Sequence, residues 1–274
     1  MGNIIKETKL PNGNKIFCLR ETEVPILYEQ IQGYIKYGIE LHEGDIVFDV
    51  GANIGLFALW AYQNCHKNVN IYAFEPIPAV FNVLQANAQR FDSDKIKAFS
   101  CGLSQESKSI TFAYNPNASM LSSAYPEDSN EIKNQLNQSI FRNLKYAQKN
   151  FHWLFLFPKF MRPFFIEKLM ERTFKIERIT CQLKTLSEMI REQNIEKIDL
   201  LKIDVEKSEL DVLLGIEAQD WQKIKQIVVE VHDLEDRLQT ITNLLKEQGL
   251  SEIQVEQEPL FQGSNIFNVY AWRG

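Results

Sequence analysis

The chain has 274 residues, of which 45% are hydrophobic and 24% charged, so it can bury a substantial core, and α/β chains of this length are commonly one domain. A net charge of −6 and a pI near 5.4 argue against a non-specific nucleic-acid surface. The four cysteines form no CxxC pair, and no apolar run reaches the roughly 20 residues of a membrane span. We therefore expect a cytoplasmic protein without a zinc site, a disulfide framework or a transmembrane segment.

The first 44 residues are predicted to cap the sheet that follows. Residues 8–20 have the pattern of a hairpin that turns at Pro11-Asn12-Gly13-Asn14, and residues 25–37 carry apolar side chains at helical spacing. This cap is either pure scaffold or a cover over a bound cofactor.

Residues 46–60 are predicted to form a strand, a glycine turn and a helix. Gly51 allows a tight turn and lets a ligand lie against bare backbone, and Gly55 lets the helix pack close to the strand. Asn53 lies between the two glycines. The turn is therefore predicted to hold a ligand.

Two carboxylates indicate the charge of that ligand. A dinucleotide turn cradles a pyrophosphate with amide hydrogens, so Asp49, two residues before Gly51, would repel it. Asp49 suits a ligand with a cationic end, and S-adenosylmethionine carries an ammonium and a sulfonium group. Glu75, followed by Pro76, ends the next apolar strand, where an acidic side chain accepts hydrogen bonds from two ribose hydroxyls. A nucleoside with a positive tail fits both carboxylates.

The alternation of helix and strand continues after these motifs. Pro78 opens a helix with one apolar face, and residues 96–102 are predicted to form a third strand that ends in small residues. Ligands lie beyond the carboxyl ends of strands in a doubly wound sheet, which brings Cys101 and Gly102 near an adenine ring. An ordinary turn after a strand would have the same composition.

Residues 116–175 interrupt the alternation. They include a polar stretch, an amphipathic helical pattern and a Phe-rich segment over 151–166 that is too short and too often broken by proline to span a bilayer. One interpretation is a helical flap packed on the core. The other is a lid that presents an apolar surface to an apolar substrate, a carrier protein or a membrane face.

The alternation then returns and predicts the fold. Strands are expected over 179–183, 198–205 and 225–231, helices over 185–191, 210–216 and 234–248, and a terminal antiparallel pair over 252–256 and 265–272. This order predicts an α/β protein with a Rossmann-like, doubly wound, mostly parallel sheet. We expect one domain over 1–274, with the core in 45–115 and 176–274.

Charged residues gather at the ends of two late strands. Asp204 and Glu206 share one side of the fourth main strand with Lys202, and Glu230 and His232 share one side of the fifth. Charge on a buried strand is costly unless it is paired or lies at the rim, where this fold binds substrate. Lys202 is expected to neutralise Asp204.

These residues suit methyl transfer to a hydroxyl, an in-line displacement that a general base assists. His232, with an ordinary pKa of about 6.5, is the predicted base. Asp204 or Glu206 orients it or binds the substrate, and Glu230 belongs to the same catalytic group. Two alternatives stay open: His232 as a structural link, and a Mg²⁺ or Mn²⁺ site formed by the four side chains.

At this point the sequence resembles the FkbM-type branch of class I methyltransferases. The resemblance rests on Asp49–Gly55, Phe74–Pro76, Ile198–Glu206 and Ile227–His232, and covers roughly residues 10–115 and 176–235. Asn53, where many class I enzymes have glycine, is similar to this branch. Lys207 departs from it, because glycine usually follows the glutamate that matches Glu206.

The resemblance implies S-adenosylmethionine as cofactor, S-adenosylhomocysteine as product, and a hydroxyl acceptor on a polyketide, macrolide, sugar or related metabolite, sometimes bound to a carrier protein. The predicted cofactor-binding residues are Asp49, Gly51, Asn53, Gly55, Glu75, Pro76, Cys101, Gly102 and Asp204. Two other classes are weighed against it. Asp49 disfavours a nicotinamide oxidoreductase, and a non-catalytic module would keep the fold for interaction through 151–166.

Overall fold

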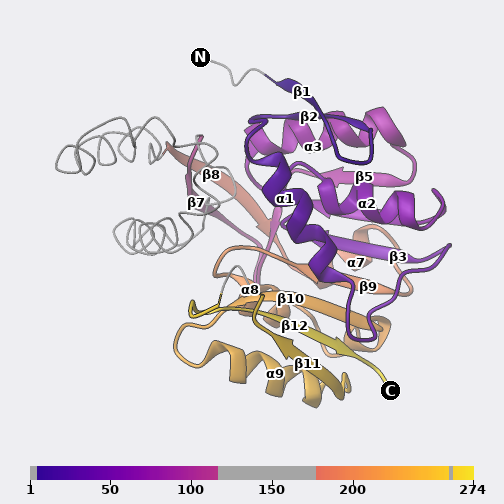
Figure 1. The fold of residues 1–274 in the computed structure, drawn as a ribbon. Helices are drawn as coiled ribbons and strands as arrows, with labels where there is room; N and C mark the ends of the chain where they lie inside the picture. The colour runs from indigo at the N-terminus through magenta and orange to yellow at the C-terminus, as the bar shows by residue number, and fades with distance from the viewer. Residues whose placement is uncertain (1–4, 117–176, 259–261) are drawn as a thin grey trace. The chain divides into compact units, whose positions relative to one another are not determined.

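The computed structural model describes residues 5–116, 177–258 and 262–274 (Figure 1). The expected flap or lid over 116–175 lies outside these residues, apart from Pro116. The chain divides into two compact units, one of Met1–Thr111 with Ile179–Gly274 and one of Phe112–Arg178. All of the predicted site residues belong to the first unit.

A seven-stranded sheet forms the centre of the first unit, in the order β11-β12-β10-β9-β3-β4-β5. Its strands are β3 (Ile46–Val50), β4 (Asn70–Phe74), β5 (Ile96–Phe99), β9 (Leu200–Ile203), β10 (Gln226–His232), β11 (Glu252–Glu256) and β12 (Ile266–Trp272). The pairs among β3, β4, β5, β9 and β10 are parallel, whereas β12 is antiparallel to β10 and to β11. The predicted doubly wound, mostly parallel sheet with an antiparallel terminal pair is confirmed.

Helices cover both faces of this sheet (Figure 1). They are α2 (Leu56–Asn64) and α3 (Pro78–Phe91) on one face, and α7 (Leu186–Glu192), α8 (Glu209–Leu214) and α9 (Arg237–Glu247) on the other. Side chains alternate between the two faces along each strand. Phe48 joins a buried cluster with Met189 of α7, and Ala73 packs with Leu84 of α3. No helix in the described ranges is both long and apolar enough to cross a bilayer.

The N-terminal segment, which the sequence predicts to be a cap, contains a hairpin and a helix. It contains the hairpin β1 (Lys6–Lys9) and β2 (Lys15–Cys18), the helix α1 (Val24–Gln30) and the 3₁₀ turn η1 (Ile31–Tyr34). The predicted helix over 25–37 tightens into this 3₁₀ turn at Ile31, and the turn contains Gly33, a poor helix former. The Tyr270 hydroxyl donates to the Gly33 carbonyl at 2.7 Å, which ties the cap to β12.

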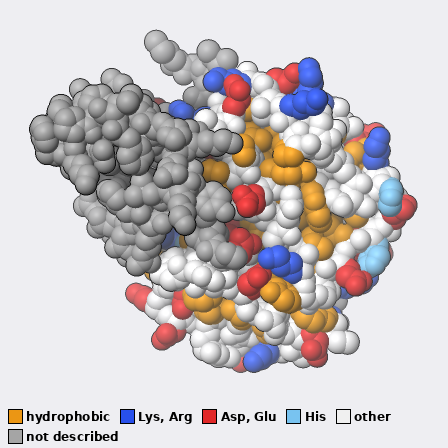
Figure 2. All heavy atoms as spheres, viewed as in Figure 1, with side chains coloured by type: hydrophobic (Ala, Val, Ile, Leu, Met, Phe, Trp, Pro, Cys, Tyr) orange, Lys and Arg blue, Asp and Glu red, His pale blue; other side chains and the backbone are white. Residues whose placement is uncertain are grey.

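Apolar side chains lie over the cap on the face shown in Figure 2. Two large hydrophobic side chains of the N-terminal segment, Ile26 and Tyr37, are 45% and 46% exposed. A second, three-stranded sheet has the order β6-β8-β7, with β6 (Gly102–Leu103), β7 (Lys108–Tyr114) and β8 (Glu177–Lys184).

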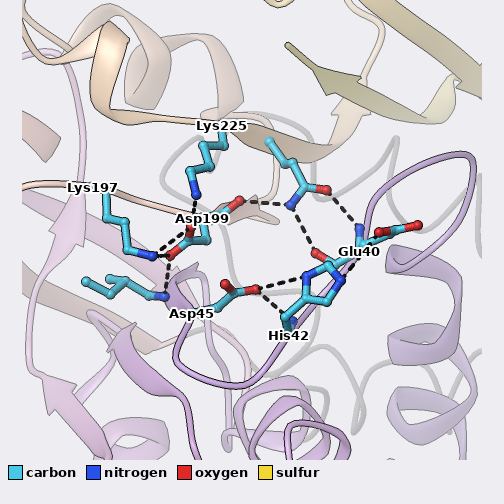
Figure 3. A network of polar contacts seen from close by, with 8 residues as sticks. Glu40, His42, Asp45, Lys197, Asp199 and Lys225 are labelled. Atoms are coloured by element: carbon cyan, nitrogen blue, oxygen red, sulfur yellow. Dashed lines mark hydrogen bonds and ion pairs between the residues drawn. The ribbon is translucent and has the colours of Figure 1, made fainter. Parts of the chain in front are cut away.

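A buried carboxylate ties the amino ends of the central strands together (Figure 3). Asp199, 1% exposed, accepts hydrogen bonds from the Ile46 amide at 2.9 Å, from Lys225 at 2.6 Å and from Lys197 at 3.2 Å. Burial disfavours its charge, but these donors hold the pKa of Asp199 below its usual value. The network fixes β3 against β9 and β10 at the edge opposite the predicted site.

Candidate functional site

The glycine turn after β3 is held by contacts that only glycine permits. Gly51 has φ +76°, and a Cβ there would collide with the carbonyl oxygen of Asp204. The Gly51 and Ala52 amides donate to the Phe74 carbonyl at 3.1 and 3.0 Å. The turn is therefore fixed between the ends of β4 and β9.

Gly55 has a different role from the one that the sequence suggests. It has φ +86° and precedes α2, and a Cβ there would lie 2.7 Å from Leu84 of α3. Gly55 therefore permits a close contact between two helices, rather than between a helix and its strand.

Glu75 lies at the end of β4 and binds the turn. Its Oε2 accepts from the Asn53 amide at 3.1 Å and its Oε1 from the Ile77 amide at 2.8 Å. The side chain is 7% exposed, and burial raises the pKa of Glu75 to about 7 against the lowering effect of these two amides. Asn53 is left-handed at φ +50°, and its own Oδ1 accepts from the Ile54 amide at 2.8 Å.

The residues after β5 lie beside this turn. A Cβ on Gly102 would lie 3.4 Å from Pro76 and 2.6 Å from Leu183 of β8, so the backbone is tightly packed there. Cys101 is buried, and burial raises the pKa of its thiol to about 11. The thiol is therefore protonated at neutral pH and can contribute shape but not charge.

A row of charged groups runs from β3 to the cap. Asp49 is fully buried, and its Oδ1 lies 3.0 Å from Lys202 Nζ, which also donates to the Gly51 carbonyl at 3.0 Å. Asp204 lies farther from Lys202, at 3.7 Å, and accepts a hydrogen bond from the Tyr34 hydroxyl at 2.9 Å. Burial disfavours the ammonium, but the carboxylates raise the pKa of Lys202. Lys202 therefore neutralises Asp49 first, rather than Asp204 alone.

His232 is held between two carboxylates. Its Nδ1 lies 2.8 Å from Glu209 Oε1, and its Nε2 lies 3.3 Å from Glu206 Oε2. Burial disfavours the imidazolium, but both carboxylates raise the pKa of His232 well above its usual value. Glu209 is fully buried, whereas the Glu206 side chain is 30% exposed. An entering molecule can therefore reach the pair from the Glu206 side.

The loop that carries Glu206 has an unusual backbone. Glu206 and Lys207 have φ +49° and +77°, a region that favours glycine. The Lys207 amide donates to Glu209 Oε1 at 2.8 Å, and Arg237 donates to the Lys207 carbonyl at 2.6 Å. These contacts hold the turn in place, and the positive φ explains why glycine suits position 207.

Glu230 completes the predicted catalytic group. It directly follows Val229, the partner of Ile203 in the parallel ladder, so it lies level with Asp204. Burial, together with Asp204 and Glu206, raises the pKa of Glu230 well above its usual value. Over the described parts of the chain, no group of three or more His, Cys, Asp or Glu side chains has the arrangement of a metal site.

Three contributors were not predicted from the sequence. Tyr34 and Arg237 come from distant elements, α9 in the case of Arg237, and no local pattern marks them. The sequence does contain a signal for Glu209. It follows Glu206 by three residues and is the first residue of a helix. A carboxylate at that position meets free amide hydrogens and can face back toward the end of the strand.

The strand order, the antiparallel β12 and the glycine turn after β3 define the class I methyltransferase fold. The family described as the methyltransferase FkbM domain matches residues 49–251. The chain is also 35% identical to the 31-O-demethyl-FK506 methyltransferase FkbM of Streptomyces tacrolimicus, over 100% of this chain and 99% of the relative. The chain belongs to the FkbM methyltransferase family.

Two further relatives differ in their size and source. The AMB antimetabolite synthetase AmbE of Pseudomonas aeruginosa is 33% identical over 97% of this chain, which spans only 12% of that protein. The methyltransferase sdnD of Sordaria araneosa is 30% identical, over 85% of this chain and 84% of the relative.

Proposed function

We propose that the protein is an S-adenosylmethionine-dependent O-methyltransferase that acts on a hydroxyl of a small, mainly apolar secondary metabolite. The observation that carries this proposal is the convergence of both predicted groups on one edge of the sheet, where Gly51 packs against the Asp204 carbonyl. The cofactor motifs follow β3 and β4, and the charged strand ends follow β9 and β10.

The residues around the turn suit the cofactor. Gly51 is half-buried, and its turn is fixed against the Asp204 carbonyl. Burial raises the pKa of Glu75, and hydrogen bonds from a pair of ribose hydroxyls would stabilise its ionised form. Asp204, which lies farther from Lys202 than Asp49 does, adds negative charge for a cationic methionine end. Asp49 holds Lys202 in place beside it, and Asn53, Gly55, Pro76, Cys101 and Gly102 shape the rest of the site. When bound, S-adenosylmethionine would supply the activated methyl group.

The Glu206–His232 pair is proposed to receive the acceptor's proton. Glu209 fixes the imidazole through Nδ1, so Nε2 and Glu206 face the open side. Because Glu206 and Glu209 raise the pKa of His232 well above its usual value, we propose that the imidazole carries a proton near neutral pH. The acceptor hydroxyl would then give its proton either to Glu206 or to His232 after the imidazole has passed its own proton to Glu206. Either route leaves one proton on the pair for each methyl group transferred.

The acceptor class is proposed from the relatives and from composition. The names of FkbM and AmbE concern an FK506 derivative and an antimetabolite, which favours a natural product, either free or bound to a carrier. The Phe-rich 151–166 favours an apolar body. If this segment is a lid, deletion of 125–172 keeps cofactor binding and abolishes turnover, and unchanged turnover would contradict that role.

The test is a methylation screen with S-adenosylmethionine and hydroxylated natural products, read by mass spectrometry and by formation of S-adenosylhomocysteine. We expect O-methyl products that His232→Ala does not form. Products methylated on nitrogen or carbon would contradict the hydroxyl assignment. Turnover that EDTA abolishes would favour the metal-assisted alternative, and absence of both cofactor binding and products would favour an interaction module.

A further inference from the structure

Two buried polar groups lie side by side on β10 and β12 without a role in the contacts described above. Glu230 and Asn268 are direct partners in the antiparallel ladder, so their side chains leave the same face of the sheet. They are 6% and 3% exposed. Both lie near the edge where β10 ends and β12 begins, the edge that carries Asp204 and His232.

Both groups have hydrogen-bonding capacity that the protein does not use. No hydrogen bond or ion pair to the Glu230 carboxylate occurs within residues 5–116, 177–258 and 262–274. The Asn268 Nδ2 donates to Glu258 at 3.0 Å, but its buried Oδ1 has no partner. A buried acceptor left unpaired costs about 1–3 kcal/mol, and a charged one more. Two such acceptors side by side indicate a place for a donor that comes from outside the chain.

The position of this pair assigns it to the acceptor rather than to the cofactor. β10 and β12 are the second and third strands from β3 along the sheet, which corresponds to roughly 10 and 14 Å at about 4.8 Å per strand. The turn with Gly51 and Glu75 lies on β3 and β4, toward the other end of the sheet. Glu230 and His232 are two residues apart on one strand, about 7 Å between Cα atoms.

The surrounding charges define the ligand chemistry. Glu230 interacts electrostatically with six charged or titratable groups, which are Tyr34, Lys202, Asp204, Glu206, Glu209 and His232. The two cations are already engaged, Lys202 by Asp49 and His232 by Glu206 and Glu209. A hydroxyl would offer a single donor and no charge. A protonated amine offers three donors and a positive charge, which matches the Asn268 Oδ1 and the carboxylate that Glu230 becomes when it loses its proton.

We propose that Glu230 and Asn268 form a subsite for an ammonium group of the acceptor, a few bonds from the hydroxyl that is methylated. The acceptor is thus an amino alcohol on an apolar body. This inference rests on the proposed methyl transfer to a hydroxyl. Burial and the neighbouring carboxylates raise the pKa of Glu230, whereas an ammonium favours its ionised form, so binding of the ammonium is expected to release a proton into solvent.

The experiment is a calorimetric titration of the protein saturated with S-adenosylhomocysteine. The probe is 2-amino-1-phenylpropan-1-ol, and the neutral comparison is 1-phenylpropane-1,2-diol, in which a hydroxyl replaces the amine. Measurements near neutral pH in phosphate and in MOPS, which differ in ionisation enthalpy and are not amino alcohols, give the number of protons released. We expect the amine to bind at least about tenfold more tightly than the diol, with proton release.

Variants separate the subsite from general electrostatics. Glu230→Gln is expected to abolish the preference for the amine and the proton release. Glu256→Gln makes the same substitution on β11, where Glu256 is the ladder partner of Asn268 and is paired with Lys36 at 3.0 Å, and it is expected to keep both the preference and the proton release. Equal binding of the two probes, no binding of either, or a preference that survives Glu230→Gln would overturn the inference.

The design also distinguishes this inference from the proposed function. Failure of the wild type to bind S-adenosylhomocysteine would overturn the cofactor assignment and, with it, the inference. Normal binding of S-adenosylhomocysteine without a preference for the amine would overturn the inference alone. If Glu230→Gln weakens S-adenosylhomocysteine itself, the subsite belongs to the amino-acid end of the cofactor, which also overturns it.

Discussion

Replacing Lys207 with glycine should stabilise the protein, although it removes a whole side chain. Lys207 has φ +77°, where a residue with a Cβ is strained by about 1–2 kcal/mol. Its contacts to Glu209 and Arg237 use only the backbone amide and carbonyl, and glycine keeps both. Glycine also has more conformational freedom in the unfolded chain, and this offsets about 0.5–1 kcal/mol of the strain energy that the substitution removes.

The net effect of Lys207→Gly is therefore a gain of about 1 kcal/mol in the free energy of unfolding, or roughly 2–4 °C in Tm. Equilibrium denaturation in urea measures the first and calorimetry the second. Lys67 is a matched control, since it has φ +67° in the turn between α2 and β4, and Lys67→Gly should stabilise to a similar degree. If Lys67→Gly stabilises and Lys207→Gly does not, then backbone strain is not what distinguishes position 207.

Three further predictions concern the site. Gly51→Ala should weaken S-adenosylhomocysteine binding by at least about tenfold, whereas Gly44→Ala, with φ +86° and open space around its Cβ, should not; equal affinities by calorimetry would refute the packing argument. His232→Ala should bind the cofactor normally and lose about 10²–10⁴-fold in turnover, and full activity would assign the base elsewhere. Because the pKa of Glu75 is raised to about 7 and its ionised form accepts the ribose hydrogen bonds, affinity should fall by up to about tenfold from pH 8 to pH 6; a fall of the same size in Glu75→Gln would contradict this.

The fold was largely predictable because its signals are local. The apolar run of β3 and the glycine turn that follows it each span only a few residues. Strand ends were less predictable. β9 ends at Ile203, two residues before the apolar run does, because Asp204 and Val205 leave the sheet to enter the strained turn.

The pairing of charges could not be predicted, because it depends on the register between strands. The sequence places Lys202 and Asp204 on one side of a strand, but Lys202 is the direct ladder partner of Asp49 on β3, and this brings those two closest. The hydrogen bond between Glu209 and His232 likewise joins the first residue of a helix to the end of a strand more than twenty residues away. Alternation along one strand predicts which face of the sheet a side chain lies on, but it does not predict which residue of the next strand lies beside it.

The cofactor is the central claim, and isothermal titration with S-adenosylhomocysteine tests it most directly. The wild type should bind with a micromolar Kd. Glu75→Ala should bind at least about tenfold more weakly, since a charge-assisted hydrogen bond is worth roughly 1.5–3 kcal/mol. Absence of binding to the wild type, or equal affinity in Glu75→Ala, would contradict the claim.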